Sequence, residues 1–169
     1  MHRAAAALIA AVLSLSAVTA MAATGDEGLA GLLPQPKPAP TPLRLPPPPR
    51  ADALVRVPQH GELEFFIDPA SMLRVSATEV RYTLVARSDH GADNVGYEAF
   101  DCARPAWRVE ALWLGGRWQP QPQAQWIPVD RGLAGVHGTL DTDYLCSEGT
   151  VDGGVAELRA RLRRGARIP

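Results

Sequence analysis

The two cysteines of this chain are the residues whose chemistry would say most about its function. Cys102 ends the stretch NVGYEAFDC, which places Tyr97 and Glu98 within five residues of the sulfur. The stretch is either a reactive thiol beside an acid or a strand that ends in a structural crosslink. A nucleophilic cysteine needs a base or a positive charge nearby to form the thiolate, and Arg104 is the one neighbour that supplies a charge. The acidic neighbours disfavour a thiolate, so the crosslink is the better hypothesis.

Histidines and aspartates are the next residues that could form a site. His60, His90 and His137 each precede a glycine, and none has a metal-site spacing such as H-x-x-x-H. We therefore expect them to be exposed loop residues. Asp141 and Asp143 resemble the start of a calcium loop, but the glycine and glutamate that complete such a loop are missing. A turn is the better interpretation there, and neither a metal nor a cofactor is expected.

Motifs of nucleotide, nucleic-acid and hydrolase chemistry are missing from the sequence. No serine stands in G-x-S-x-G, and there is neither a glycine-rich phosphate loop nor a stripe of basic and aromatic residues. Glu98 and Glu110 fall on neighbouring predicted strands, and a pair of carboxylates can cleave glycosides. Solvent-facing positions explain both glutamates at least as well, so no catalytic residue is assigned. The formal net charge of −1 indicates neither nucleic acid nor membrane as a partner.

The N-terminus has the plan of a secretory signal peptide. His2 and Arg3 begin it, an apolar run covers residues 4–18, and the sequence AMA at 20–22 fits the small-x-small cleavage rule. No cysteine lies near the cut, so a lipoprotein is not expected, and the alanine-rich run would be a weak membrane anchor. The sequence therefore predicts a periplasmic protein, cut after Ala22 and without stable membrane insertion after cleavage.

An oxidising compartment favours a disulfide. Two cysteines in an exported chain of this size predict one bridge, between Cys102 and Cys146. Closing that loop would stabilise the fold by about 4 kcal/mol in the chain-entropy model. The sequence has no C-x-x-C, which excludes a thioredoxin-like redox centre.

Composition divides the chain after the signal peptide, residues 1–22, into three segments. Residues 23–58 hold ten of the sixteen prolines, which lack the amide hydrogen and fix φ, so a disordered polyproline II spacer is expected. All ten aromatic residues lie in 59–150, which predicts a packed β-rich domain with 13 acidic and 7 basic residues. Residues 151–169 carry five arginines and two acidic residues, so this helix and basic tail should pack against the acidic domain.

The spacing of apolar residues predicts the secondary-structure elements. Alternation of apolar and polar residues predicts strands in 62–67, 80–87, 94–102, 107–114 and 125–129. Turns are expected at 68–71, 88–93 and 115–116. The stripe Val151, Val155, Leu158 and Leu162 predicts an amphipathic helix, firm over Val155–Arg164 and ended by Gly165. The fold class predicted is α+β, a mostly antiparallel sheet with a C-terminal amphipathic helix packed on one face.

Four tryptophans lie within twenty residues of one another: Trp107, Trp113, Trp118 and Trp126. Buried tryptophans would fill the core between sheet and helix, which is the interpretation we favour. Exposed ones could stack on sugar rings or hold a peptide. Trp118 is the best candidate for exposure, because it follows a turn and precedes a polar loop of glutamine and proline.

Several of these stretches resemble the CNP1-like family of exported bacterial proteins. The stretches FFIDPAS, VRYTLVARS, GADNVGYEAFDC and YLC follow the order of that family. The resemblance covers Glu62–Cys146 and excludes the proline-rich spacer and the C-terminal helix. The family has Gly-Ile-Arg before the cysteine, where this chain has Ala99-Phe100-Asp101, so a positive charge beside Cys102 is absent. The resemblance implies an exported compact domain and implies no reaction.

The expected function is that of a non-enzymatic binding or cell-envelope accessory module. Its possible binding surface is the sheet face or loop around Arg81, Tyr97, Glu98 and Trp118, where aromatic residues and arginine are concentrated. The expected partner is an envelope protein or a glycan. The alternative is a periplasmic hydrolase or thiol enzyme centred on Glu98 and Cys102.

Overall fold

The computed structural model describes residues 42–58, 61–129 and 135–165. The predicted signal peptide, the first part of the predicted spacer and His60 lie outside the described residues. Within the described ranges, no helix is both long and apolar enough to cross a membrane.

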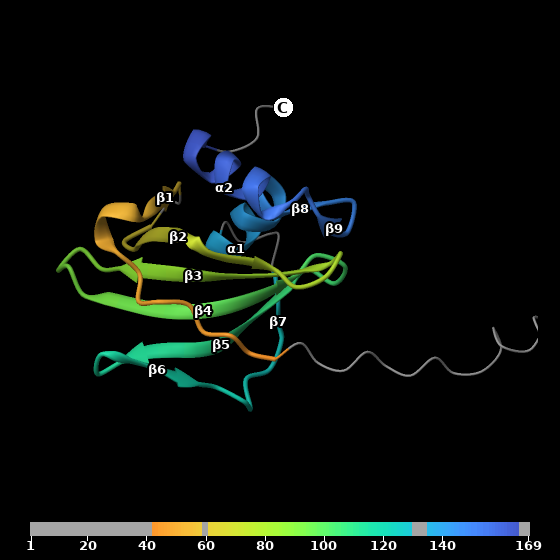
Figure 1. The fold of residues 1–169 in the computed structure, drawn as a ribbon. Helices are drawn as coiled ribbons and strands as arrows, with labels where there is room; N and C mark the ends of the chain where they lie inside the picture. The colour runs from red at the N-terminus through yellow and green to blue at the C-terminus, as the bar shows by residue number, and fades with distance from the viewer. Residues whose placement is uncertain (1–41, 59–60, 130–134, 166–169) are drawn as a thin grey trace, which may run out of the picture. The chain divides into compact units, whose positions relative to one another are not determined.

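One antiparallel sheet of seven strands dominates the described residues (Figure 1). Its strands are β1 (Val55–Val57), β2 (Glu64–Arg74), β3 (Glu79–Arg87), β4 (Asp93–Asp101), β5 (Ala106–Leu114), β6 (Arg117–Pro120) and β7 (Ile127–Pro128). Strands β1 to β6 lie side by side in chain order, and β7 pairs with the start of β5. Short turns suffice for such a meander, since antiparallel neighbours need no crossover. The predicted mostly antiparallel sheet is confirmed.

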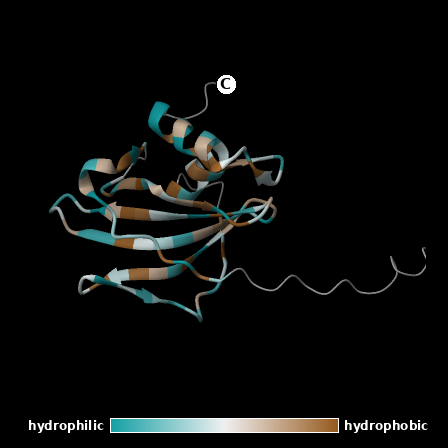
Figure 2. Ribbon diagram, in the orientation of Figure 1, coloured by the Kyte–Doolittle hydropathy of each residue, from teal (hydrophilic) through white to brown (hydrophobic). Residues whose placement is uncertain are grey.

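Helical segments lie against one face of the sheet. They are α1 (Val136–Thr139), the π-helical η2 (Leu140–Leu145) and α2 (Val155–Arg164), with a small hairpin of β8 (Cys146–Ser147) and β9 (Thr150–Val151). Leu158 and Leu162 of α2 are buried in one core cluster with Tyr82 and Phe100 of the strands. The predicted C-terminal helix and its bounds are confirmed, although Val151 belongs to β9. Figure 2 shows hydrophobic and hydrophilic residues interleaved along the strands beneath this layer.

Strand β2 passes through DPAS, where a turn was expected. Its register with β3 shifts between Asp68 and Leu73, which is a β-bulge. Ser71 Oγ donates to the carbonyl of Asp68 at 2.7 Å and accepts the amide of Thr83 at 2.7 Å. The prediction of a turn is therefore wrong, because turn-forming residues are used here inside a strand.

Two arginines of α2 attach the helix to the rest of the domain. The guanidinium of Arg159 donates to three carbonyl oxygens of the bulged strand, those of Pro69, Ala70 and Met72. Arg161 donates to the carbonyl oxygen of Tyr144 in η2 at 2.7 Å. This part of the basic tail packs against the acidic domain as expected, and residues 166–169 lie outside the described ranges.

The end of the predicted spacer belongs to the folded domain. Residues Ala51–Ala53 form a 3-10 helix, η1, and β1 pairs with β2. A disordered spacer is therefore the wrong prediction for these residues, because residues 50–57 are free of proline and can donate backbone hydrogen bonds. Residues 42–50 are in neither helix nor strand. Figure 1 shows this segment, in orange, running across β3, β4 and β5.

Candidate functional site

The two cysteines are bonded to each other. Cys102 follows β4 and Cys146 begins β8, and their sulfur atoms are 2.01 Å apart. Both residues are buried. The predicted disulfide is confirmed, and the thiol enzyme is wrong, because Cys102 has no free thiol.

The four residues of the possible binding surface lie on both faces of the sheet. Glu98 stands opposite Tyr82 in the register of β3 and β4, on the face that the helices cover. Arg81, Tyr97 and Trp118 lie on the other face. Arg81, Tyr97 and Glu98 are each at most 5% exposed, and Trp118 is half-buried. The structure thus brings three of the four together, but they do not form an exposed surface.

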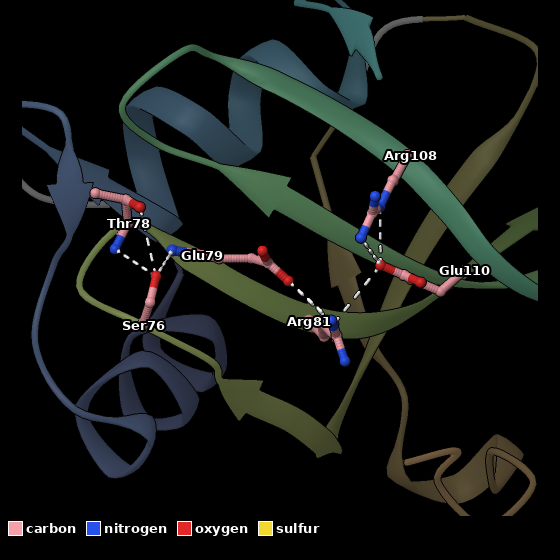
Figure 3. A network of polar contacts seen from close by, with 6 residues as sticks. All are labelled: Ser76, Thr78, Glu79, Arg81, Arg108 and Glu110. Carbon is pink, nitrogen blue, oxygen red and sulfur yellow. Dashed lines mark hydrogen bonds and ion pairs between the residues drawn. The ribbon is translucent and has the colours of Figure 1, made fainter. Parts of the chain in front are cut away.

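A network of ion pairs surrounds Arg81 (Figure 3). Its Nε donates to Glu79 Oε1 at 3.1 Å and lies 3.7 Å from Glu110 Oε1. Arg108 Nε donates to the same oxygen of Glu110 at 2.9 Å. Ser76 Oγ accepts the amide of Glu79 at 3.0 Å, in the turn before β3. The charge of a buried arginine is thereby balanced within the chain, which gives Arg81 a structural role.

A hollow of about 520 Å³ lies where β7 meets β5. Its lining among the described residues is Arg104, Pro105, Ala106, Trp126, Pro128 and Val129. The guanidinium of Arg108 lies 4.5 Å from the centre of the Trp126 ring. Arg104 pairs with Asp101 at 2.9 Å, and Arg108 pairs with Glu110. The arginines around the hollow are therefore already paired, and their charge specifies no anionic ligand.

Glu98 pairs with the histidine of α1. His137 Nε2 lies 2.8 Å from Glu98 Oε2, and the imidazole stacks on Trp107 with 3.8 Å between ring centres. The side chain of His137 is 15% exposed. An exposed loop is therefore the wrong prediction for His137, because the stretch VHG begins a helix that packs on the sheet. His90, by contrast, is exposed as expected.

The two glutamates of the hypothetical glycosidase pair lie apart. Glu98 contacts His137 on the helix-covered face, and Glu110 contacts the arginines on the other face. Both are largely buried, so solvent-facing positions are also the wrong prediction. The physical reason is that the helices cover one face and residues 42–50 run across the other (Figure 1).

Asp141 and Asp143 lie in the π-helical η2, where a turn was expected. Asp141 is buried, at 3% exposed. In the ranges that the structure describes, no group of three His, Cys, Asp or Glu side chains is placed to hold a metal ion.

Tyr82 is a buried phenol beside a carboxylate. Its hydroxyl has no hydrogen-bond partner among the described residues. Burial, and then the charge of Glu98, raises the pKa of Tyr82 well above its ordinary value of 10.0. The unfolded chain releases this proton above about pH 10, whereas the folded chain retains it. Stability is therefore complete below that pH and falls as the pH rises above it.

We expect Tyr82→Phe to change the free energy of unfolding by no more than about 1 kcal/mol at neutral pH, because the hydroxyl lies beside Glu98 but makes no hydrogen bond of ordinary geometry. Above about pH 10 the variant should lose less stability than the wild type, by up to about 1.4 kcal/mol per pH unit. Urea denaturation at a series of pH values measures both the effect at neutral pH and the loss of stability at high pH. Parallel pH profiles of the two proteins would contradict the assignment.

All four tryptophans are half-buried, and none belongs to the fully buried core. Trp107 packs against the core cluster from its edge. The prediction that the tryptophans fill the space between sheet and helix is wrong for the other three. Smaller aliphatic side chains and tyrosines fill that space instead.

Trp113 and Trp118 face each other across a tight hairpin. Gly115 and Gly116 form its turn with φ of +59° and +76°, which glycine adopts freely, and the register pairs the two tryptophans directly. Their ring centres are 5.3 Å apart with planes at 72°, and Tyr97 lies 6.1 Å from Trp118. We call these three residues, Tyr97, Trp113 and Trp118, the aromatic face.

The aromatic face holds the chain's own proline-rich segment. Trp118 Nε1 donates to the carbonyl oxygen of Pro46 at 2.7 Å. Trp113 lines a hollow together with Pro48 and Pro49. Sequence reasoning missed Pro46 and Trp113 as parts of this site. The sequence does hold a signal for the contact between Trp113 and Trp118, because the two residues are placed symmetrically around Gly115 and Gly116.

Comparison with known proteins identifies the family. No curated protein and no solved structure matches this chain. The family model described as CNP1-like family matches residues 38–163. This match is wider than the expected range of 62–146, and it includes both the proline-rich segment on the aromatic face and all of α2 except its last residue. The chain therefore belongs to the CNP1-like family.

Proposed function

We propose that this chain is a periplasmic, non-enzymatic binding module of the cell envelope, which holds a partner polypeptide on its aromatic face. One observation carries the proposal: Trp118 already holds an extended peptide segment, through the 2.7 Å hydrogen bond to the carbonyl of Pro46. Tryptophan suits such a role, because it offers a large apolar ring and one N–H donor.

The pairing of the reactive groups supports binding over catalysis. Cys102 is in a disulfide, and Glu110 is held between two arginines. The disulfide also agrees with export, because oxidising compartments are where such bonds persist. A hydrolase centred on Glu98 stays the alternative, with the Glu98–His137 pair as its general base.

Photo-crosslinking tests the proposal. A photoreactive amino acid replaces Pro120, which is exposed and lies two residues after Trp118 in β6, on the same face of the sheet, or Arg163, which is exposed on α2 and serves as the control. The full chain is produced with its signal peptide in a bacterium that encodes it, and whole cells are irradiated. We expect an adduct from position 120 that proteinase K digests, that is reduced several-fold by Trp118→Phe, and that is absent from position 163.

Three results would contradict the proposal. Absence of an adduct at position 120 would contradict binding of a partner polypeptide. Equal adducts at positions 120 and 163 would show that the partner does not bind at the aromatic face. An adduct that resists proteinase K and disappears on glycosidase treatment would replace the polypeptide by a glycan.

A further inference from the structure

We infer that the aromatic face recognises polyproline II segments, and that Pro46–Pro49 is a resident ligand that competes with a proline-rich segment of a partner polypeptide. This inference rests on the proposed function and names the chemical class of the partner. It follows from the geometry of the segment, from the groups that contact it and from the hollow that remains beneath it.

The segment contacts the sheet with a period of three residues. Pro46 and Pro49 are half-buried, whereas Pro47 and Pro48 between them are exposed. A polyproline II helix has three residues per turn, so its positions i and i+3 lie on one edge. The observed burial is that of such a helix with one edge on the sheet.

The aromatic face supplies what a polyproline II helix lacks. Such a helix has no internal hydrogen bonds, so its carbonyl oxygens are free to accept. The indole N–H of Trp118 donates to one of them, that of Pro46. The rings of Trp113 and Trp118, inclined at 72°, form an angular apolar surface beside it. Aromatic-lined grooves are the general means by which proteins bind proline-rich segments, because these segments are already ordered and lose little entropy.

The resident segment does not fill the space beneath it. A hollow of about 290 Å³ remains between it and the sheet, lined by Pro48, Pro49 and Trp113 among others. A core contact would fill such a space. Strand β1 follows the segment and stays anchored through Val57, which is 1% exposed. Release of residues 42–50 would expose the face that they cover, but it would keep β1 paired with β2, as local opening of one segment does.

The resident segment is covalently tethered to its site, which lowers the apparent affinity of an added segment. A segment joined to its site by a short linker acts at an effective concentration on the order of millimolar. A free proline-rich segment must displace it, so the apparent affinity falls by the fraction of chains whose site is open. Removing the contacts of the resident segment should therefore strengthen binding of an added one.

The test uses the chain from residue 23 to 169 with Pro46→Ala and Pro49→Ala, the opened variant. The probe is a fluorescent peptide of residues 43–50, LRLPPPPR, and its binding is followed by anisotropy. We expect at least about tenfold tighter binding to the opened variant than to the wild type. The matched peptide LRLAPPAR, which keeps the two exposed prolines, should bind at least about tenfold more weakly.

Two tryptophan variants locate the binding. Trp118→Phe in the opened variant keeps a ring but removes the N–H donor, and should weaken binding about fivefold. Trp126→Phe, at a half-buried tryptophan outside the aromatic face, should leave binding unchanged. Equal affinity of the opened variant and the wild type, or equal effects of the two tryptophan variants, would overturn the inference. If the opened variant does not fold, the test is made with the wild type and the peptide at millimolar concentration. Binding that Trp118→Phe weakens would support the inference, and absence of such binding would overturn it.

Competition separates this inference from the proposed function. Excess LRLPPPPR should abolish the photo-adduct at position 120. An adduct that persists would overturn the polyproline II inference while the binding function stands. Peptide binding without any cellular adduct would overturn the proposed function, and with it the partner named here.

Discussion

Replacing Cys102 and Cys146 together by alanine is expected to lower the free energy of unfolding by about 4 kcal/mol. The bridge spans a sequence separation of 44 residues and therefore restricts the unfolded chain strongly. It also ties the end of β4 to the segment that contains α1 and η2. Urea denaturation of the oxidised wild type and of the double variant measures the difference, which is a large part of the net stability of a typical domain.

Reduction provides the control for this prediction. Wild type unfolded and refolded with a thiol reductant should show the same loss, whereas the double variant should not respond to the reductant. Alanine is preferred to serine, because both cysteines are buried and a hydroxyl would lack a partner. A wild type whose unfolding midpoint does not change on reduction would contradict a stabilising bridge.

The strands and the C-terminal helix could be predicted because their signals are local. Period-two alternation together with SDHGAD predicts the hairpin of β3 and β4, and Gly115-Gly116 predicts the hairpin of β5 and β6. The helix α2 has both an apolar stripe and a terminating glycine, Gly165, whose φ is +94°. Each of these signals is complete within about ten residues.

The helical segment between β7 and β8 could not be predicted, because tertiary contacts stabilise it. Its sequence VHGTLDTDYL contains glycine, threonines and aspartates, which are poor helix formers. Leu140, Tyr144 and Leu145 are each at most 1% exposed in the structure, and the disulfide follows directly. Burial of these side chains outweighs the weak helix propensity of the segment. The sheet must be formed before these side chains can be buried, so the sequence of the segment alone does not show it.

The candidate site escaped prediction for a related reason. Alternation in β3 marks Arg81 and Thr83 as polar, and a polar face normally indicates solvent. Both are buried here, because a segment whose composition indicates disorder lies across that face. Trp118 and Pro46 are 72 residues apart in sequence, and no local pattern connects them. Trp118 could be predicted as a contact residue, but what it contacts could not.

Breaking the ion-pair network of Arg81 is the second change that we expect to lower the stability strongly. Arg81→Met is expected to lower the free energy of unfolding by about 3 kcal/mol, because breaking a buried ion pair leaves an uncompensated carboxylate. The side chain of Arg81 is 5% exposed, and those of Glu79 and Glu110 are 23% and 12% exposed. Arg108 still pairs with Glu110 in the variant, so the charge left without its partner is mainly that of Glu79. Urea denaturation at neutral pH measures the loss.

A surface arginine of the same sheet offers a matched control. Arg56 pairs with Glu64 at 3.0 Å, but the two side chains are 56% and 50% exposed. Arg56→Met should therefore cost less than about 1 kcal/mol. Adding Glu79→Gln to Arg81→Met should recover part of the loss, because the remaining carboxylate is neutralised. Equal losses for Arg56→Met and Arg81→Met would show that the buried network does not stabilise the fold. A folded Arg81→Met variant that is less stable but binds the peptide with unchanged affinity would show that Arg81 supports the sheet and that Trp113 and Trp118 recognise the peptide.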